Sequence, residues 1–230
     1  MSLRFFAGPI TRYGVLARST MENERHSGSG SGTLLARMLF FSDAVFAIVL
    51  TLLVLDLRLP AGVTDAGLFR GLHELQPKLG AFAITFGLVS VFWMAHVSIT
   101  RRLNAFDWTV AWVNLLFLFT ITLAPFISTL LGEFSVLGNA WRLYCLALIA
   151  IGIAQFALFL VVYRGNGRLI GGVDRREFWH RSIRAASPAA SFAVLLALNL
   201  MGFTRMSFIL SFLIIPTIII LVRVSLSRRR

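Results

Sequence analysis

Long apolar stretches are the feature of this chain that most restricts its possible folds. A membrane-spanning helix needs about 20 predominantly apolar residues, and six windows meet this need, at residues 38–59, 80–100, 108–131, 141–163, 183–203 and 206–223. The apolar fraction of 57% exceeds the roughly 45–50% of soluble domains. A helix also satisfies its own backbone groups where the hydrocarbon offers no water. The sequence therefore predicts an all-α, polytopic integral membrane protein with six transmembrane helices.

The sequence outside these windows is short. We expect residues 1–33 to form a flexible cytoplasmic tail, because they end in a Ser-Gly repeat and such segments are flexible. Residues 34–226 form the predicted six-helix membrane domain, and residues 227–230 form a basic cytoplasmic tail. The connection at 60–79 contains two prolines and three glycines, so we expect it to hold one short turn of helix.

The positive charge is distributed in a way that predicts the orientation. The net charge of +12 comes mainly from arginines grouped between the apolar windows, and cytoplasmic loops are enriched in such residues. With a cytoplasmic N-terminus, all but five of the 22 Lys and Arg residues lie inside; the five are Arg58, Arg70, Lys78, Arg142 and Arg205. Both termini are therefore predicted to be cytoplasmic. This pattern disfavours nucleic acid as a partner, since binding it requires a continuous basic face.

The sequence offers no support for an enzyme, a metal site or a cofactor. Its single cysteine, Cys145, lies in an apolar window, where a lone thiol usually packs as a small hydrophobic group. No His-Glu-x-x-His or Gly-x-Ser-x-Gly motif and no pair of carboxylates occurs within a window, so a nucleophile with its base is missing. Three aromatic residues are expected in the interfacial belts of the membrane: Trp108, Trp141 and Tyr144.

A polar cluster lies at the start of the first window, where Ser42 and Asp43 follow Arg37. Polar side chains at membrane depth need partner groups, because the hydrocarbon supplies no water. Candidate partners with indole, imidazole and carboxamide groups occur on the second and third windows: Trp93, His96 and Asn114. For each of them a packing role is favoured over ion binding, because most buried polar groups simply pair with one another.

The first window also has an apolar face. At about 100° per residue, six side chains fall within one stripe roughly 80° wide, with Thr51 at its edge, and Ser42 and Asp43 point away from it. The six are Phe41, Val45, Ile48, Leu52, Leu55 and Leu59. A stripe of this kind usually faces lipid or packs in a core. The alternative is a pore wall, in which copies of the helix form apolar rings that gate by excluding water.

The first window begins with Arg37-x-x-x-Phe41-Ser42-Asp43 and continues Ala-Val-Phe-Ala-Ile-Val-Leu-Thr-Leu-Leu-Val-Leu-Asp. This start resembles the prokaryotic transmembrane protein 175 family of potassium channels. The resemblance extends over residues 36–132 and includes Trp93-x-x-His96, Asp107, Trp112-x-Asn114-Leu115-Leu116 and Pro125-Phe126. Residues 133–230 agree with the family only in the number of windows and in their basic loops.

The resemblance implies a homotetramer in which the first helix of each subunit lines a central pore. By position, Ile48 would form the tightest apolar ring, Leu52 and Leu55 further layers, and Thr51 a hydroxyl layer linked to potassium preference. The resemblance also implies a structural polar network that holds the helices in register. Its members would be Arg37, Phe41, Ser42, Asp43, Trp93, His96 and Asn114.

Two functions follow as hypotheses. The first is a passive channel in the cell membrane, surrounded by lipid, that conducts monovalent cations, prefers the potassium ion and needs no cofactor. The chain has no Thr-Val-Gly-Tyr-Gly sequence, so its selectivity must arise without a carbonyl filter. The alternative is a proton channel or proton-coupled transporter that uses Asp43 and His96, since carboxylate and imidazole groups within membranes relay protons.

Overall fold

The structure, a computed structural model, describes residues 10–134, 138–172 and 174–211, with side chains from residue 30 onward except at 165–168. Every element within these ranges is helical, which confirms the predicted all-α fold. The α-helices are α1 (Ile10–Leu52), α2 (Leu68–Glu74), α3 (Gln76–Thr100), α4 (Trp108–Thr122), α5 (Ala124–Glu133), α6 (Asn139–Gly167) and α7 (Arg175–Leu200). Three 3-10 turns accompany them: η1 (Leu53–Asp56), η2 (Asp65–Gly67) and η3 (Arg168–Ile170).

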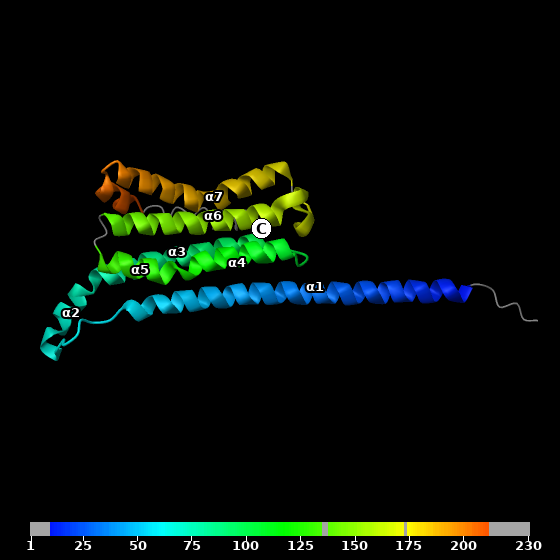
Figure 1. Ribbon diagram of the computed structural model, residues 1–230, viewed down its shortest axis with the longest axis horizontal. Helices are drawn as coiled ribbons and strands as arrows, with labels where there is room; N and C mark the ends of the chain where they lie inside the picture. Colours follow the sequence, from blue (N-terminus) through cyan, green and yellow to red (C-terminus); the bar gives the residue numbers. More distant parts are fainter. Residues whose placement is uncertain (1–9, 135–137, 173, 212–230) are drawn as a thin grey trace, which may run out of the picture.

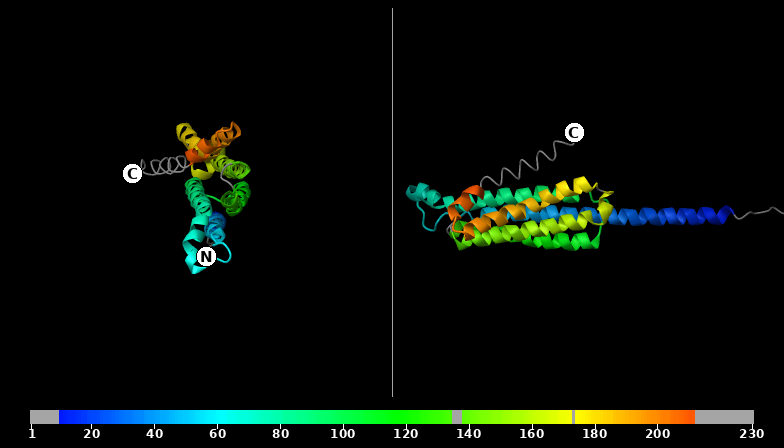
Figure 2. Two further views of the ribbon diagram at one scale, coloured as in Figure 1. Left: turned by 90° about the vertical axis from the view of Figure 1, so that its left-hand side faces the viewer. Right: turned by 90° about the horizontal axis from the view of Figure 1, so that it is seen from above.

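The long helices run side by side in layers (Figure 1). Helix α1 lies along one face of the bundle, where it packs against α3, α4 and α5. Helix α6 packs on α4, and α7 covers the opposite face through an extensive contact with α6. Turned views show the same order, with α2 projecting from one end (Figure 2). Helix α1 is therefore a peripheral helix that its own subunit covers on one side.

Within the described residues, five helical segments are long and apolar enough to span a membrane: 30–56, 76–100, 108–133, 139–164 and 175–200. They correspond to the first five predicted windows. The sixth window, 206–223, lies mostly outside the described residues, as does the predicted tail 227–230. The third window is a bent span of α4 and α5, divided at Leu123. Pro125 at the start of α5 lacks a backbone N–H, so it cannot continue the hydrogen bonding of α4.

The ends of the first helix differ from the sequence-based prediction. Helix α1 begins at Ile10, so residues 10–33, expected as part of a flexible tail, are helical. Extending an existing helix adds one hydrogen bond per residue without a new nucleus, which lets the helix pass through the Ser-Gly repeat. At its other end α1 stops at Leu52 and tightens into η1, so Leu55 lies in η1 and Leu59 lies beyond it. The following connection contains the two-turn helix α2.

Aromatic side chains fill the centre of the bundle. Trp141 and Tyr144 in α6 are fully buried and stack with 5.7 Å between ring centroids, so the prediction that they lie in an interfacial belt is wrong. Their polar atoms have internal partners, which replace interfacial water. The Tyr144 hydroxyl lies 3.0 Å from Thr85 Oγ1, and Trp141 Nε1 donates to Ser207 Oγ at 2.9 Å. Trp108, at the start of α4, is exposed.

Asp107 fixes the loop between α3 and α4. Its carboxylate caps α4 by accepting a hydrogen bond from the Val110 N–H at 3.0 Å, and it accepts two from Arg164 of α6 at 2.8 and 2.9 Å. Burial acts to raise the pKa of this carboxyl, but the Val110 N–H and the Arg164 charge outweigh it and hold the pKa below its ordinary value. Asp107 is therefore ionised at neutral pH and joins α4 to α6.

Candidate functional site

Helix α1 presents two distinct faces. The face that packs on the bundle is buried and comprises Leu35, Ser42, Phe46, Val49 and, in the adjoining turn η1, Leu53. The opposite face is open, with exposed fractions of 57% for Ile48, 43% for Leu52 and 57% for Leu55. Apart from Val45, which is partly buried against the core, the predicted apolar stripe is thus open in the subunit, on α1 as far as Leu52 and beyond the helix at Leu55 and Leu59.

Ser42 points into the bundle and belongs to a chain of hydrogen bonds through three helices. The imidazole Nε2 of His96 in α3 lies 2.8 Å from Asn114 Oδ1 in α4, and Asn114 Nδ2 donates to Ser42 Oγ at 2.8 Å. The Ser42 hydroxyl then donates to the Met38 carbonyl at 2.9 Å. Because Asn114 Oδ1 can only accept, His96 Nε2 carries the hydrogen. The chain therefore has one direction, from the imidazole to the backbone of α1.

This chain is enclosed by aromatic rings. The exposed fraction is 1% for both His96 and Asn114. The imidazole stacks on Phe117 with 5.6 Å between ring centroids, and the ring of Phe46 lies 5.8 Å away. The second imidazole nitrogen, Nδ1, is buried and has no hydrogen-bond partner in the described part of the chain. One titratable atom of the site is thus left unpaired.

Asp43 makes a separate contact beside this chain. Trp93 Nε1 in α3 donates to Asp43 Oδ1 at 2.9 Å, and both side chains are exposed. The contact joins α1 to α3 on the flank between the two faces of α1. Arg37 and Phe41 are exposed as well, and Arg37 has no hydrogen bond or ion pair with any described residue. The structure therefore brings together five of the seven predicted network residues and leaves Arg37 and Phe41 outside.

Thr51 adds a polar atom to the open face of α1. Its hydroxyl donates to the Ile48 carbonyl at 2.8 Å, which uses the hydrogen and leaves the oxygen lone pairs directed outward. The open face thus carries an acceptor oxygen among apolar side chains. The described residues contain no group of three His, Cys, Asp or Glu side chains that could hold a metal ion.

Gln155 in α6 is a further polar residue of the interior, and the sequence-based prediction did not include it. Its Nε2 donates to the Phe92 carbonyl at 2.8 Å, one helical turn before His96. Its Oε1 is buried without a hydrogen-bond partner among the described residues. The sequence does contain a sign of this contact, since Gln155 is a single amide between Ala154 and Phe156 in an apolar window. A buried amide without a partner is costly, so such a residue is expected to find one. Polar contacts thus link α1 to α6 through α3 and α4.

Comparisons with known proteins give matches over these helices. The model of the family described as "Endosomal/lysosomal potassium channel TMEM175" matches residues 37–125, from the polar cluster of α1 to the start of α5. A protein named potassium channel from Streptomyces collinus is 29% identical over 123 residues, which are 52% of this chain and 60% of that protein. The human protein named endosomal/lysosomal proton channel TMEM175 is 28% identical over 196 residues, which are 82% of this chain. The chain spans 38% of the length of that human relative.

A solved structure extends the similarity beyond the segment matched by the family model. The crystal structure of a TMEM175 homologue from Chamaesiphon minutus, described as a lysosomal potassium-selective channel homologue, matches with a TM-score of 0.72 and 26% sequence identity. The match covers 83% of this chain and 98% of that one. All seven residues of the predicted polar network fall within the matched segment 37–125. The chain is an integral membrane protein, and over residues 37–125 it matches the TMEM175 family of ion channels.

Proposed function

We propose that this protein is a passive channel for monovalent cations that prefers potassium to sodium and is formed by four copies of the chain around one axis. The observation that carries the proposal is the open apolar face of α1, on which Ile48, Leu52 and Leu55 lie opposite the packed face. The names of the bacterial relatives support the same class of activity. In the assembly this face would then lie against the same face of other subunits around the axis, and not against lipid.

In such an assembly the constriction is formed by Ile48. Side chains at 48, 52 and 55 follow one another at helical spacing, so four copies produce stacked apolar rings. Narrow apolar rings exclude water and thereby hinder ions. Thr51 Oγ1 donates its hydrogen to the Ile48 carbonyl, so the lone pairs of the oxygen are available to a partly dehydrated cation. Without a carbonyl filter, we expect the preference for potassium to be modest.

The polar chain behind this face is suited to positioning α1. Asn114 connects Ser42 of α1 with His96 of α3 through a carboxamide. A carboxamide does not titrate near neutral pH, so it cannot pass protons on as a carboxylate or imidazole can. Trp93 and Asp43 add a second attachment on the flank. Ile48 would therefore be held at a defined radius from the axis.

The end of the bundle where α7 begins is the proposed cytoplasmic end, in the cell membrane. Among the side chains described from residue 101 onward, seven arginines lie there against three carboxylates: Arg101, Arg102, Arg164, Arg175, Arg176, Arg181 and Arg184 against Asp107, Asp174 and Glu177. The opposite end has five cations against four carboxylates: Arg58, Arg70, Lys78, Arg142 and Arg205 against Asp56, Asp65, Glu74 and Glu133. The larger excess of positive charge at the end where α7 begins agrees with the positive-inside rule for a cytoplasmic side.

A planar-bilayer recording of the purified protein under opposed potassium and sodium gradients tests the proposal. We expect single-channel currents that reverse at a potential shifted toward the potassium equilibrium potential. Replacing all cations by the large cation N-methylglucamine should abolish the current. A reversal at zero under the opposed gradients would exclude a preference for potassium.

Ile48→Asn tests the constriction. A carboxamide attracts water to the ring, so we expect the single-channel conductance to rise several-fold. Ile153→Asn is the matched control, because Ile153 in α6 has an exposed fraction of 58%, against 57% for Ile48, but does not lie on α1. Equal conductance of the Ile48 variant and the wild type would contradict the assignment of Ile48.

Proton conduction is the second candidate function. It is favoured by the buried, unpaired Nδ1 of His96 and by the name of the human relative. An imidazole near neutral pH can bind and release a proton. Liposomes with a pH gradient and N-methylglucamine as the only other cation measure this activity alone. Under the proton hypothesis, His96→Gln abolishes the flux; an unchanged flux would exclude His96 as the relay.

A further inference from the structure

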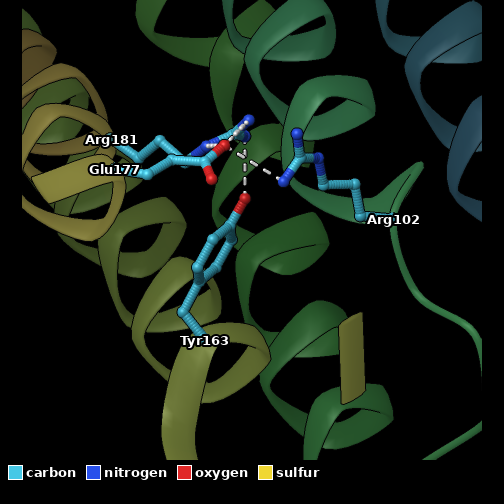
Figure 3. A network of polar contacts seen from close by, with 4 residues as sticks. All are labelled: Arg102, Tyr163, Glu177 and Arg181. Atoms are coloured by element: carbon cyan, nitrogen blue, oxygen red, sulfur yellow. Dashed lines mark hydrogen bonds and ion pairs between the residues drawn. The ribbon is translucent and has the colours of Figure 1, made fainter. Parts of the chain in front are cut away.

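The first turns of α7 are held in place by a network of polar contacts at the arginine-rich end of the bundle (Figure 3). The Glu177 carboxylate lies between Arg102, in the turn that follows α3, at 3.1 Å and Arg181 at 2.8 Å. Arg181 also donates to the Tyr163 hydroxyl of α6 at 2.8 Å, and its guanidinium carbon lies 5.8 Å from the centroid of that ring. Two guanidinium groups thus compensate the charge of Glu177, and α7 is fixed to the turn after α3 and to α6.

A surface cavity of about 330 Å³ adjoins this network. It is lined by Asp174, Arg176, Glu177, His180, Arg181 and Arg184. When Arg102 behind Glu177 is included, four guanidinium groups stand against two carboxylates. Arg176, His180 and Arg184 follow one another at intervals of four residues, so they form one row on the exposed side of α7. The cavity therefore has an excess of positive charge and several nitrogen donors.

An adjacent row on the same helix has the character of a membrane interface. Arg175, Trp179 and Ile183 also follow at intervals of four residues, with exposed fractions of 58% for Trp179 and 65% for Ile183. Tryptophan is enriched where the headgroups of a bilayer meet its hydrocarbon. A row of donors thus lies beside a row that combines an indole with an aliphatic side chain.

The length of α7 is consistent with a position of its first turns at the membrane interface. Its 26 residues extend about 39 Å at about 1.5 Å per residue, which exceeds the roughly 30 Å of a bilayer's hydrocarbon. Every ionisable residue of α7 precedes Ala185. The segment from Ala185 to Leu200 extends about 24 Å and fills most of the hydrocarbon. The preceding ten residues therefore lie at the level of the lipid headgroups.

We propose that this face of α7 binds the phosphate-bearing headgroup of an anionic phospholipid. The phosphate occupies the cavity, where Arg176 and His180 donate to its oxygens, and the acyl chains lie along Trp179 and Ile183. Guanidinium groups match phosphate oxygens in geometry and charge, and basic residues beside a membrane attract anionic lipid. The charge of Glu177 does not oppose binding, because Arg102 and Arg181 hold its carboxylate. This site is independent of the proposed channel function.

Native mass spectrometry of the full chain, released from micelles that contain equal amounts of phosphatidylglycerol and phosphatidylcholine, tests the site. We expect phosphatidylglycerol to be retained at least five-fold more often. The double variant Arg176→Gln/His180→Gln should lose this preference. Arg70→Gln is the matched control, because Arg70 is exposed at the opposite end of the bundle. Circular dichroism and size-exclusion elution verify that the variants fold, and Arg176→Gln alone replaces the double variant if that one does not.

Two further experiments distinguish a bound lipid from a free anion in the cavity. Trp179→Ala removes a contact of the acyl region only, so we expect it to weaken retention of phosphatidylglycerol while the arginines remain. Inorganic phosphate at millimolar concentration should leave the bound lipid in place. Equal retention of both lipids, equal retention by the double variant and by Arg70→Gln, or displacement by inorganic phosphate would each overturn the proposal.

Discussion

Asn114 is the residue on which the attachment of α1 depends most. A carboxamide offers an acceptor and a donor in one plane, and Asn114 uses both, toward His96 in α3 and toward Ser42 in α1. An aspartate would lose the donor, and a leucine would lose both functions. No other described side chain bonds to Ser42, so its link to the bundle passes through this residue.

Asn114→Leu should therefore lower the stability of the protein. Interhelical hydrogen bonds in membrane proteins contribute about 0.6–2 kcal/mol each, and Asn114 makes two. We expect the free energy of unfolding to fall by about 1–3 kcal/mol. Thermal unfolding in detergent, followed by loss of the size-exclusion peak, measures the change. Asn104→Leu, in an exposed loop, should change little; equal effects at both positions would show that the buried bonds contribute nothing.

At this scale the sequence predicts which residues need partners better than it predicts the partners. Ser42, His96 and Asn114 stand out because they are polar residues in apolar windows, and they do meet. Trp141 and Tyr144 were misassigned because an aromatic residue with a polar atom has the same appearance whether it meets headgroups or a buried hydroxyl. Their partners Thr85 and Ser207 are 59 and 66 residues away in the sequence, beyond the reach of local pattern.

Helices α6 and α7 approach each other closely at Gly152. A methyl group added at Gly152 of α6 would lie 2.8 Å from the Cβ and 2.9 Å from the backbone nitrogen of Ala189 in α7. Ala189 follows Pro188, a proline inside α7, which removes one helical hydrogen bond and favours a bend. Small residues allow membrane helices to pack closely. The α6–α7 contact therefore leaves no room for a side chain at position 152.

Gly152→Ala should accordingly destabilise the protein by about 1–3 kcal/mol, the usual cost of overpacking. The obstructing atoms include backbone, so the neighbouring helix must move. Gly80→Ala in α3 is the matched control, because a methyl group there meets nothing within 4 Å and alanine favours a helix by about 1 kcal/mol. The two variants should change the unfolding temperature in opposite directions. A stabilising effect of Gly152→Ala would refute the close packing inferred at this crossing.

Periodicity predicts the faces of helices better than their ends. The apolar stripe of α1 follows from spacing alone, whereas the change of the helix into η1 after Leu52 does not. Helix α7 begins at Arg175, eight residues before the predicted window. The window begins later because the arginines in the first turns of the helix lower the local hydropathy. Contacts such as Arg102 with Glu177 stabilise that first part. They depend on the tertiary arrangement, which a window of sequence does not contain.

At the scale of the whole molecule, the proposed arrangement of four subunits rests on the resemblance to known channels and not on a local sequence pattern. A single subunit leaves the face with Ile48, Leu52 and Leu55 open, and a lipid-facing helix would have the same composition. Composition alone therefore does not distinguish a lipid-facing stripe from a pore wall. The all-α fold and the first five membrane windows could be anticipated from the sequence, and the assembly is inferred by analogy.

Light scattering coupled to size exclusion measures the assembly directly. After subtraction of bound detergent, we expect a protein mass of four times the 25.6 kDa subunit. Ile48→Lys should reduce this mass, because four ammonium groups would repel one another at the axis. Ile153→Lys, on α6, should leave the mass unchanged. A wild-type mass of one or two subunits would exclude the proposed tetramer.

The layered order of the helices determines how mechanical force would travel through the subunit. Helices α3, α4 and α5 lie between α1 and the pair α6–α7 (Figure 1). A displacement of α7 within the subunit is therefore passed to α1 by way of the middle layer. The bond from Gln155 of α6 to the Phe92 carbonyl acts on the helical turn that leads to His96. A displacement of α6 would thus reach α1 through the packing of α6 on α4 and through this bond, which leads by way of His96 and Asn114 to Ser42.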